Sequence, residues 1–491
     1  MNKLPEMLIR LFCLIASLSL VPTAVSAFDS GSTGADGAFN PTVNTTLQVP
    51  PDGIFNFTSV DIPAGVTVGF ASNASNTPVT ILASGDVNIA GTLHVNGAWG
   101  TNAGASGDGN IGDDGIPGKA ALGGYAGGQG GAPGVNFGQR GLGPGGGKGA
   151  HIVYTHWRGS YYPLGGGGGG FGSVGARSVG SASSTYIAGG LSYGASILLP
   201  LVGGSGGGGG HSGTAFHGAG GGAGGGAILI AATGTLRVTG AIRANGGNGG
   251  GSDGSGSGGT GGGGSGGAIR LVATQMEGDG PIQATGGSGG HHPTGTSIGG
   301  SGGDGRIRLE AEAITRTAAT SPAYSFGQPS TVFISGLPTL RITSVAGVVA
   351  PAYPTGNADI VLPADTPNPV TVAFESIGVP VGNTIELSVI AADSHTGFSV
   401  VSPALVGTTD LATATVDINL PSGPSSLLAQ TTYTILASQG NQLAAYTEGE
   451  RVERVRLSAS LTGGSTITLI TISGKEYELP SRLPGMPGTT S

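Results

Sequence analysis

Runs of glycine that alternate with short apolar segments constrain the fold of this chain most strongly. Glycine occupies 103 of the 491 positions, and the block from Gly97 to Gly305 contains long runs such as Gly206–Gly210. Between these runs lie short apolar segments such as Ala227–Ala231. A chain that repeats a short strand and a glycine run can build a stacked β structure, but it offers few side chains for catalysis. The sequence therefore says more about architecture than about activity.

The clearest repeat unit consists of a strand, a turn, a second strand and a glycine run. One copy covers Ala227–Gly246, and a second covers Ala268–Gly286. A third copy begins with Arg306–Ala311, and Leu93–Gly97 resembles the closing strand of the same unit. Equivalent isoleucines lie 41 and then 38 residues apart: Ile228, Ile269 and Ile307. Repeats of this length predict stacked units that bury a core only together.

We predict an all-β fold in which this region is a parallel β-solenoid, similar to a right-handed β-helix. Each strand would pair with its copy in the next rung, so that backbone hydrogen bonds run along the stack. The alternation of side chains places a set of apolar residues inside: Ile228, Ile230, Ile242 and Ile269. It places three polar residues outside or along a rung face: Arg243, Arg270 and Gln283.

The glycine runs themselves admit two interpretations. As loop excursions from the solenoid they would stay loose, because glycine loses more backbone entropy on ordering than any other residue. As a packed bundle of extended chains they would exploit the fact that only glycine fits where backbones approach as closely as at the collagen axis. Collagen itself is excluded, since triplet spacing is confined to Gly112–Gly118. The prediction adopts the excursions and keeps the bundle as the alternative.

Composition divides the chain into five parts. We assign residues 1–27 to a signal peptide, 28–96 to a β-rich N-terminal part of the solenoid, 97–323 to the glycine-rich β-repeat region, 324–479 to a β-sandwich and 480–491 to a loose tail. The sandwich is predicted to be immunoglobulin-like, because glycine thins out there and longer alternating segments take over. Its candidate strands are Val370–Phe374, Thr384–Ala391, Ala414–Leu420, Thr432–Leu436, Val452–Leu461 and Thr466–Ile472.

The first 27 residues have the pattern of a secretory signal. Lys3 and Arg10 precede the apolar run Leu11–Val21, and Val25–Ala27 supplies the small residues of a cleavage site. The alternative is a permanent N-terminal anchor, although the run is shorter than the usual membrane span. We expect a secreted protein, extracellular or on the bacterial cell surface, with no transmembrane segment after cleavage. Cys13, the only cysteine, lies in this segment, so the mature chain would form no disulfide.

Charge is sparse along the chain. Charged residues make up 9% of the sequence and the formal net charge is −8. A mildly acidic chain without a basic stripe argues against nucleic acid as a partner. The glycine runs also lack the Lys-Ser/Thr that follows a phosphate-binding loop, and we expect no cofactor.

The strands that follow glycine runs resemble those of bacterial secreted glycine-rich β-repeat proteins, which are β-solenoid and adhesin-like surface proteins. The resemblance is carried by Gly225–Ala231, Gly266–Ala273 and Gly303–Glu310, and it extends over about Phe28 to Ala311. It implies an envelope-associated or adhesin-like role. It brings no catalytic residues with it.

Some β-solenoids cleave polysaccharides, and three motifs bear on that alternative. Asp113-Asp114, His217-Gly218 and Arg306–Arg308 follow in the chain order of the polygalacturonase-like enzymes that they faintly resemble. An upstream Asn-Thr-Asp element is missing, the histidine lacks a preceding glycine, and the basic motif ends in arginine instead of lysine. Glycine on both sides of the acidic pair would hold the carboxylates poorly, so a solvated acidic turn is the competing interpretation. We therefore assign no catalytic residue and keep the hydrolase or lyase as the alternative function.

Two further motifs could bind metal. Gly299–Asp304 matches the start of the nonapeptide calcium repeat, but it occurs once and its apolar position is shifted by one residue. His291-His292 lacks a third ligand at suitable spacing. We predict no metal site.

The most unusual local segment is His151–Tyr162, which concentrates aromatic residues in a chain where they make up 5%. Exposed aromatic rings with an arginine can stack on sugar rings or dock a partner. The competing interpretation is a β-hairpin that packs on the solenoid. The candidate ligand-binding residues are Tyr154, Trp157, Arg158 and Tyr161.

The favoured function is a secreted or cell-surface structural protein, adhesin-like, that presents a repetitive β surface for multivalent contacts with surface polysaccharide or other envelope components. The alternative is the β-helix carbohydrate-active enzyme. Binding of ice or mineral is less favoured, because three threonines that would have to align form no ladder: Thr235, Thr239 and Thr285.

Overall fold

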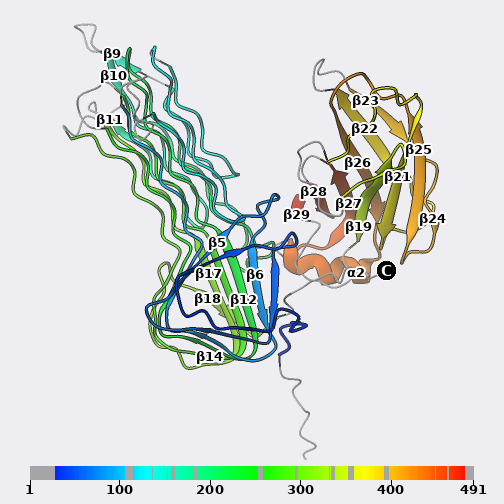
Figure 1. Ribbon diagram of the computed structural model, residues 1–491, viewed down its shortest axis with the longest axis horizontal. Coiled ribbons are helices and arrows are strands. Elements are labelled where there is room, and N and C mark those ends of the chain that lie inside the picture. The colour runs from blue at the N-terminus through cyan, green and yellow to red at the C-terminus, as the bar shows by residue number, and fades with distance from the viewer. Residues whose placement is uncertain are drawn as a thin grey trace, which may run out of the picture.

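The computed structural model is built almost entirely from β-strands and extended chains (Figure 1). It describes residues 28–104, 114–134, 136–151, 153–155, 161–180, 186–252, 258–293, 297–330, 332, 338–351, 359–391, 397–447, 449–461 and 464–480. The predicted signal peptide, residues 1–27, and residues 481–491 of the predicted tail lie outside the described residues. Within the described part of the chain, no helix has the length and apolar character needed to cross a membrane.

Strands β1 to β18 belong to the N-terminal two thirds of the chain. They are β1 (Ala38–Phe39), β2 (Thr45–Gln48), β3 (Ile54–Phe57), β4 (Ser59–Ile62), β5 (Thr67–Ala71), β6 (Val79–Ala83), β7 (Val87–Ile89), β8 (Thr92–His94), β9 (Val153–Thr155), β10 (Tyr161–Pro163), β11 (Val179–Gly180), β12 (Ala227–Val238), β13 (Ala241–Arg243), β14 (Ala268–Glu277), β15 (Ile282–Gln283), β16 (Ser297–Ile298), β17 (Arg306–Ile314) and β18 (Ser325–Gly327).

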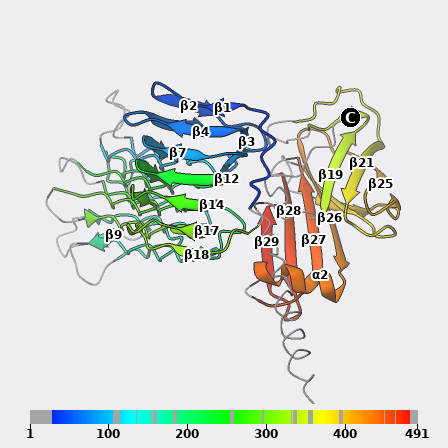
Figure 2. The ribbon, with the colours of Figure 1, turned by 90° about the horizontal axis from the view of Figure 1, so that it is seen from below.

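Two parallel sheets organise this region. The larger sheet has the order β1-β4-β7-β12-β14-β17-β18, with β3 and β6 also paired into it, and the second has the order β15-β13-β8-β5-β2. Figure 2 shows the strands of the larger sheet stacked one above the other. Ile228 pairs with Ile269, and Ile269 pairs with Ile307, so the register is the one that the repeat predicts. Leu93 likewise pairs with Ile242.

The core lies between these sheets. The four isoleucines predicted to point inward are fully buried in one cluster: Ile228, Ile230, Ile242 and Ile269. Side chains alternate along each strand, so every second residue of β12 and β14 faces this cluster. Arg243 and Gln283 are half-buried, as expected for a rung face. Arg270, predicted to point out or to lie along a rung face, alternates with Ile269 and Leu271 and so faces away from this cluster, but it is fully buried because other residues cover it. Glu310, on the neighbouring strand, accepts two hydrogen bonds from its guanidinium.

The glycine runs form a packed bundle and not loose excursions. We call it the polyglycine bundle and define it by residues 97–104, 114–132, 138–150, 164–176, 186–191, 203–213, 217–226, 245–252, 258–267, 285–292 and 297–305. These chains run side by side away from the parallel sheets (Figure 1). More than half of the chain between β8 and β12 belongs to it, although Val79 of β6 and Ile228 of β12 are directly paired.

Hydrogen bonds in the bundle repeat every three residues. In the chain 217–226, every third N–H donates to the same neighbour, and the three neighbours lie at 125–131, 259–265 and 95–101. A period of three is that of the extended helix of polyproline and collagen chains, which has no internal hydrogen bonds. All pairing is therefore between chains. The three sets of donors are Gly218, Gly221 and Gly224; Ala219, Gly222 and Gly225; and Gly220, Ala223 and Gly226.

Close approach of the backbones explains why these positions are glycine. A Cβ atom on Gly221 would lie 2.0 Å from the carbonyl oxygen of Gly207. A Cβ atom on Gly207 would lie 2.2 Å from the Gly262 oxygen, and one on Gly262 would lie 2.1 Å from the Gly167 oxygen. Ordering these glycines costs backbone entropy, which is why loose loops are expected from the sequence. Hydrogen bonds between closely packed backbones, which only glycine permits, offset that cost.

The C-terminal part of the chain consists of two antiparallel sheets with a shared core. Their orders are β20-β19-β21-β25-β24 and β23-β22-β26-β27-β28-β29. Leu340 and Val372 of the first sheet and Leu387 and Leu457 of the second belong to one buried cluster. The elements are β19 (Thr339–Val345), β20 (Val348–Val349), β21 (Val370–Ile377), β22 (Glu386–Ala391), β23 (Gly397–Val401), β24 (Val406–Gly407), β25 (Ala412–Ile418), β26 (Ser425–Thr434), α2 (Ala437–Gln442), η2 (Leu443–Tyr446), β27 (Val452–Ser460), β28 (Gly464–Thr471) and β29 (Glu476–Pro480). Every predicted strand of this part overlaps an observed one.

Candidate functional site: surfaces of the polyglycine bundle

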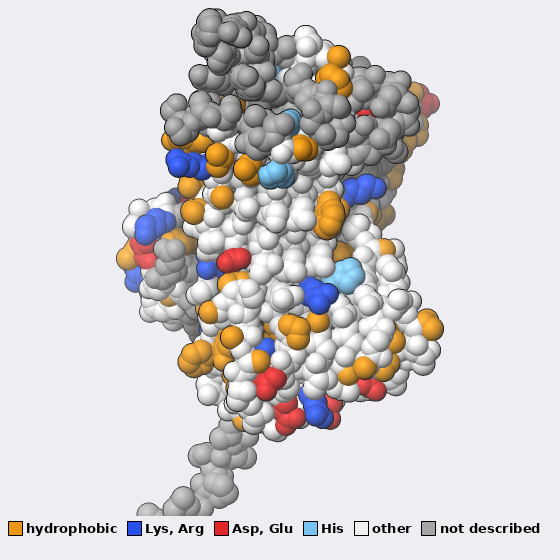
Figure 3. All heavy atoms as spheres, turned by 90° about the vertical axis from the view of Figure 1, so that its left-hand side faces the viewer, with side chains coloured by type: hydrophobic (Ala, Val, Ile, Leu, Met, Phe, Trp, Pro, Cys, Tyr) orange, Lys and Arg blue, Asp and Glu red, His pale blue; other side chains and the backbone are white. Residues whose placement is uncertain are grey.

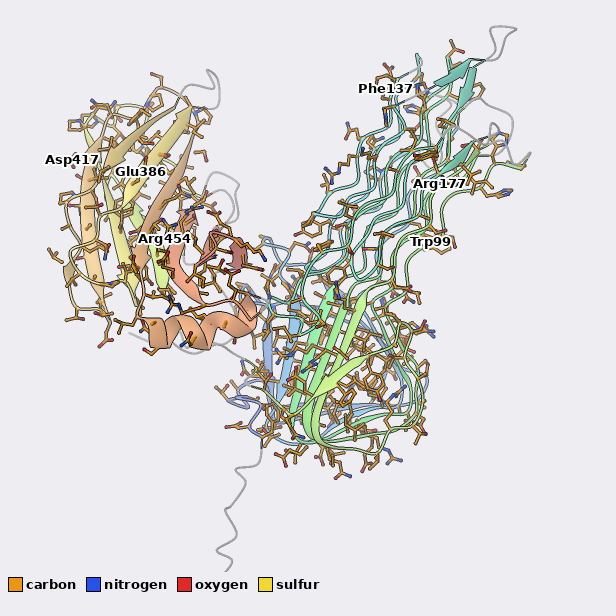
Figure 4. All side chains as sticks on the ribbon, turned by 180° about the vertical axis from the view of Figure 1, so that it is seen from behind. Trp99, Phe137, Arg177, Glu386, Asp417 and Arg454 are labelled. Carbon is orange, nitrogen blue, oxygen red and sulfur yellow. The ribbon has the colours of Figure 1, made fainter. Side chains whose placement is uncertain are left out.

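Several large side chains of the polyglycine bundle lie on its surface, whereas others, such as Leu164, Phe171 and His211, are buried within it. Several apolar residues are well exposed there, among them Trp99 at 71% and Leu191 at 74%. In Figure 4, Trp99 stands on the flank of the bundle near the parallel sheets, whereas Phe137 lies near the far end. The bundle thus presents two separate places, the far end and the flank, where a partner could dock.

The predicted aromatic segment lies at the far end of the bundle (Figure 1). Strands β9 and β10 pair antiparallel there, with Tyr162 opposite Tyr154 and Tyr161 opposite Thr155. Antiparallel pairing of two neighbouring strands is what the β-hairpin interpretation predicts. It places the backbones of Tyr154 and Tyr161 on facing strands. Trp157 and Arg158 lie outside the described residues. The structure therefore brings two of the four candidate residues into one hairpin.

A regular array of side chains covers the flank of the bundle. Three chains lie side by side and parallel there, at 97–104, 245–252 and 285–292, and the first two are joined by hydrogen bonds from Gly97, Gly100 and Ala103 to carbonyls of the next chain. Because each chain repeats every three residues, every third side chain points to the same side. We call the resulting set of positions the flank array: Asn96, Trp99, Asn102; Asn245, Asn248, Gly251; and Thr285, Ser288, His291.

Asparagine side chains tie the columns of the flank array together. The Asn96 Oδ1 accepts the N–H of Asn245 at 2.8 Å, and the Asn102 Oδ1 accepts the N–H of Gly251 at 2.9 Å. In the next column, the Asn245 and Asn248 Oδ1 atoms accept the N–H groups of Thr285 and Ser288. Each carboxamide is therefore fixed through its oxygen, which leaves its NH₂ group as the free end.

Trp99 interrupts this pattern. Along its own chain Trp99 lies midway between Asn96 and Asn102, and on the neighbouring chain it faces Asn248. An asparagine at this position would accept the N–H of Asn248. Indole has no acceptor atom in its ring plane. Among the described residues, no protein acceptor is found for the Asn248 N–H. An exposed aromatic ring thus lies beside an unused backbone donor.

The flank array escaped prediction from the sequence. Its signal is the three-residue spacing of Asn96, Trp99 and Asn102, repeated in Asn245 and Asn248. That spacing has meaning only if the glycine runs form three-residue helices, which belongs to the alternative that the prediction set aside.

The residues of the enzyme alternative are brought together in part. The His217 Nε2 lies 3.7 Å from the Asp114 Oδ1, and both side chains are partly exposed. Asp113 lies outside the described residues. The basic motif is elsewhere and engaged, since Arg306 donates to the Tyr193 carbonyl and Arg308 to Glu310. The described residues at this place are one carboxylate and one histidine, whereas inverting glycoside hydrolysis uses two carboxylates.

The two metal motifs lie on the surface of the bundle. Asp304 and His291 are exposed, and the N–H of Asp304 donates to the Ser173 Oγ. In the described part of the chain, no group of three His, Cys, Asp or Glu side chains could hold a metal ion.

His211 is a buried titratable group within the bundle. Its side chain is fully buried, its Nδ1 lies 2.6 Å from the Ser212 carbonyl oxygen, and Phe137 packs edge-on against its ring. Its buried Nε2 has no partner among the described residues. Burial lowers the pKa of His211, because the charged form would lose its hydration.

No family model, curated protein sequence or solved structure matches this chain. The function is therefore inferred from the geometry of these surfaces.

Proposed function

We propose that the protein is a secreted or cell-surface structural protein, adhesin-like, in which the polyglycine bundle acts as a stiff stalk that holds binding surfaces away from the parallel sheets. The single observation that carries the proposal is the three-residue hydrogen-bond pattern of the chain 217–226. A chain whose residues are hydrogen-bonded to neighbouring chains resists bending, whereas a free glycine loop is flexible.

The connections of the bundle to the sheets favour the same role. Strands β12, β14 and β17 each begin at the residue that follows a bundle chain, at Ala227, Ala268 and Arg306. Hydrogen bonds of the sheets therefore continue into the bundle without an intervening linker. At about 3.1 Å per residue, a ten-residue chain such as 217–226 spans about 30 Å. The hairpin of β9 and β10 would be displayed at that distance.

The finer fold assignments belong to this proposal. The parallel sheets would form a β-solenoid, similar to a right-handed β-helix, whose stacked rungs anchor the stalk. The two antiparallel sheets would form an immunoglobulin-like domain. Sparse charge suits weak, repeated contacts with surface polysaccharide, in which avidity exceeds the affinity of one site.

A glycan array tests the proposal directly. Purified residues 28–491 are incubated with the array, and reducing ends released from the same glycans are measured. We expect binding without turnover, weakened by replacing both Tyr154 and Tyr161 with alanine if the hairpin carries it. Absence of binding to every glycan would contradict the adhesin-like role.

The carbohydrate-active enzyme is the second candidate because Asp114 and His217 lie 3.7 Å apart. Proton transfer needs about 2.6–3.2 Å between the two heavy atoms, so this contact would have to tighten when a substrate binds. Turnover in the same assay that disappears in Asp114→Asn and in His217→Gln would favour this candidate over the stalk.

A further inference from the structure

We infer that the flank array is a binding face for an uncharged polysaccharide, with Trp99 as its central contact. The inference deepens the proposed function and rests on it for the exposure of the protein to such polymers. It concerns a different surface from the β9–β10 hairpin, so the two can fail separately.

The first argument is the exposure of Trp99. Its side chain is 71% exposed on a chain where glycine and alanine are its neighbours, Ala98 and Gly100. A large, rigid aromatic ring contributes more contact area to a binding face than any other side chain, and it loses little conformational entropy. The apolar face of a sugar ring is the natural partner for such a flat surface.

The second argument is the set of donors around the ring. The carboxamides of Asn96 and Asn102 are held in place through their oxygens, three residues before and after Trp99. The N–H of Asn248 lies in the same row as Trp99 and has no acceptor among the described residues. Sugar hydroxyl oxygens accept hydrogen bonds from groups of this kind, and groups already held in place lose little entropy on binding.

The third argument is charge. Among the nine positions of the flank array only His291 can titrate, and no Lys, Arg, Asp or Glu is present. In Figure 3, the left-hand side of the molecule in Figure 1 is largely white, the colour of the backbone and of side chains such as Asn, Ser and Thr, with charged side chains scattered over it. Arg243, which is half-buried, lies two residues before Asn245 at the end of the array next to the sheets. With one cation at its edge and none within it, the array offers little electrostatic attraction to an anionic polymer, so it favours a neutral glycan.

The dimensions of the array favour a polymer over a single sugar. At about 3.1 Å per residue, Asn96 and Asn102 lie about 19 Å apart along one column. Contacts repeated at that spacing can engage several units of one chain, so that weak contacts add up.

Affinity electrophoresis with single-tryptophan variants tests the inference. The chain contains two tryptophans, Trp99 and Trp157, so in Trp157→Phe the indole fluorescence reports Trp99 alone. Residues 28–491 are run in gels that contain a soluble β-glucan, a galactomannan or, as the charged counterpart, polygalacturonate. We expect at least one neutral polysaccharide to retard the protein and to shift the Trp99 emission to shorter wavelength, while polygalacturonate has no effect.

Two alanine variants separate the array from general surface effects. Trp99→Ala is expected to weaken retardation at least tenfold. Leu191→Ala, which removes an apolar side chain of similar exposure from another chain of the bundle, is expected to leave it unchanged. Circular dichroism of each variant checks that the fold is retained.

Each other outcome overturns the inference in a recognisable way. If Trp99→Ala binds like the wild type and Trp157→Ala does not, the hairpin is the site and the proposed function stands. If the Trp99 emission shifts with protein concentration alone, a second copy of the chain covers the face. If no neutral polysaccharide retards the protein or changes the emission, the flank array binds no such polymer, and the glycan array decides the proposed function independently.

Discussion

Arg270 of β14 and Glu310 of β17 form a two-pronged ion pair that is buried from solvent. The Arg270 Nε and Nη2 each lie 3.1 Å from one oxygen of the Glu310 carboxylate, and the two side chains are 0% and 1% exposed. Glu310 also accepts hydrogen bonds from Arg308 and from the hydroxyl of Ser330. Burial alone would raise the pKa of Glu310, but the hydrogen bonds and charge of Arg270, with those of Ser330 and Arg308, outweigh it and lower the pKa.

Glu310→Ala is predicted to destabilise the parallel sheets strongly. It leaves the Arg270 guanidinium buried without a counter-charge, and loss of one partner of a buried pair costs about 3–5 kcal/mol. Denaturant unfolding of residues 28–491, followed by circular dichroism, measures the loss. The double variant Arg270→Met with Glu310→Leu should recover most of it, because neither charge then remains. A Glu310→Ala protein within about 0.5 kcal/mol of wild type, the usual range of surface substitutions, would show that this pair stabilises nothing.

Stability is predicted to fall as the pH drops below about 6.5. Burial lowers the pKa of His211, and burial followed by the charge of Arg243 lowers that of His94. Both histidines therefore bind fewer protons when folded than when unfolded. Their contribution is complete above the unfolded pKa of 6.5 and is lost as the pH falls toward their folded values.

The double variant His94→Gln with His211→Gln isolates this effect. Its midpoint of thermal unfolding should change less between pH 7.5 and pH 5.5 than that of the wild type. Equal changes in the two proteins would mean that other groups carry the pH dependence in this range.

Glycine-to-alanine substitutions are predicted to destabilise the bundle far more than the sheets. At Gly221 the new Cβ would lie 2.0 Å from the Gly207 carbonyl oxygen, a backbone atom that cannot move aside alone. At Gly69 of β5 it would lie 3.5 Å from the His94 Nε2, an ordinary contact. Gly221→Ala should therefore cost more than about 3 kcal/mol by overpacking, whereas Gly69→Ala should be close to neutral. Equal stability of the two variants in denaturant would contradict the packing described for the bundle.

The sequence predicts the parallel sheets well, because their pattern is local. Alternating β-branched residues mark each strand, and the spacing of the repeat is enough to set the register of Ile228, Ile269 and Ile307. The burial of Arg270 escapes this reasoning, since its partner Glu310 comes from the next rung and Ser330 from a later segment. Side-chain alternation alone cannot show which outward positions another segment covers.

The bundle and its flank could be predicted only in part. The sequence allows close packing of the glycine chains as one of two alternatives, but glycine carries no side-chain pattern that shows which chains are neighbours. The hydrogen bond from Gly221 to Gly128, the close approach of Gly221 to Gly207 and the contact of Asp114 with His217 all join segments that are far apart in the sequence. Trp99 becomes a candidate only once the three-residue helix fixes the side on which it stands.

Hydrogen–deuterium exchange of residues 28–491 tests most directly whether the glycine runs form an ordered stalk. Amides of 203–213, 217–226 and 258–267 donate to neighbouring chains, so peptides covering them should exchange orders of magnitude more slowly than an unfolded glycine chain, and about as slowly as β12 and β14. Gly221→Ala should increase exchange throughout the bundle. Exchange of these peptides at the rate of an unstructured chain, with β12 and β14 protected, would contradict the account.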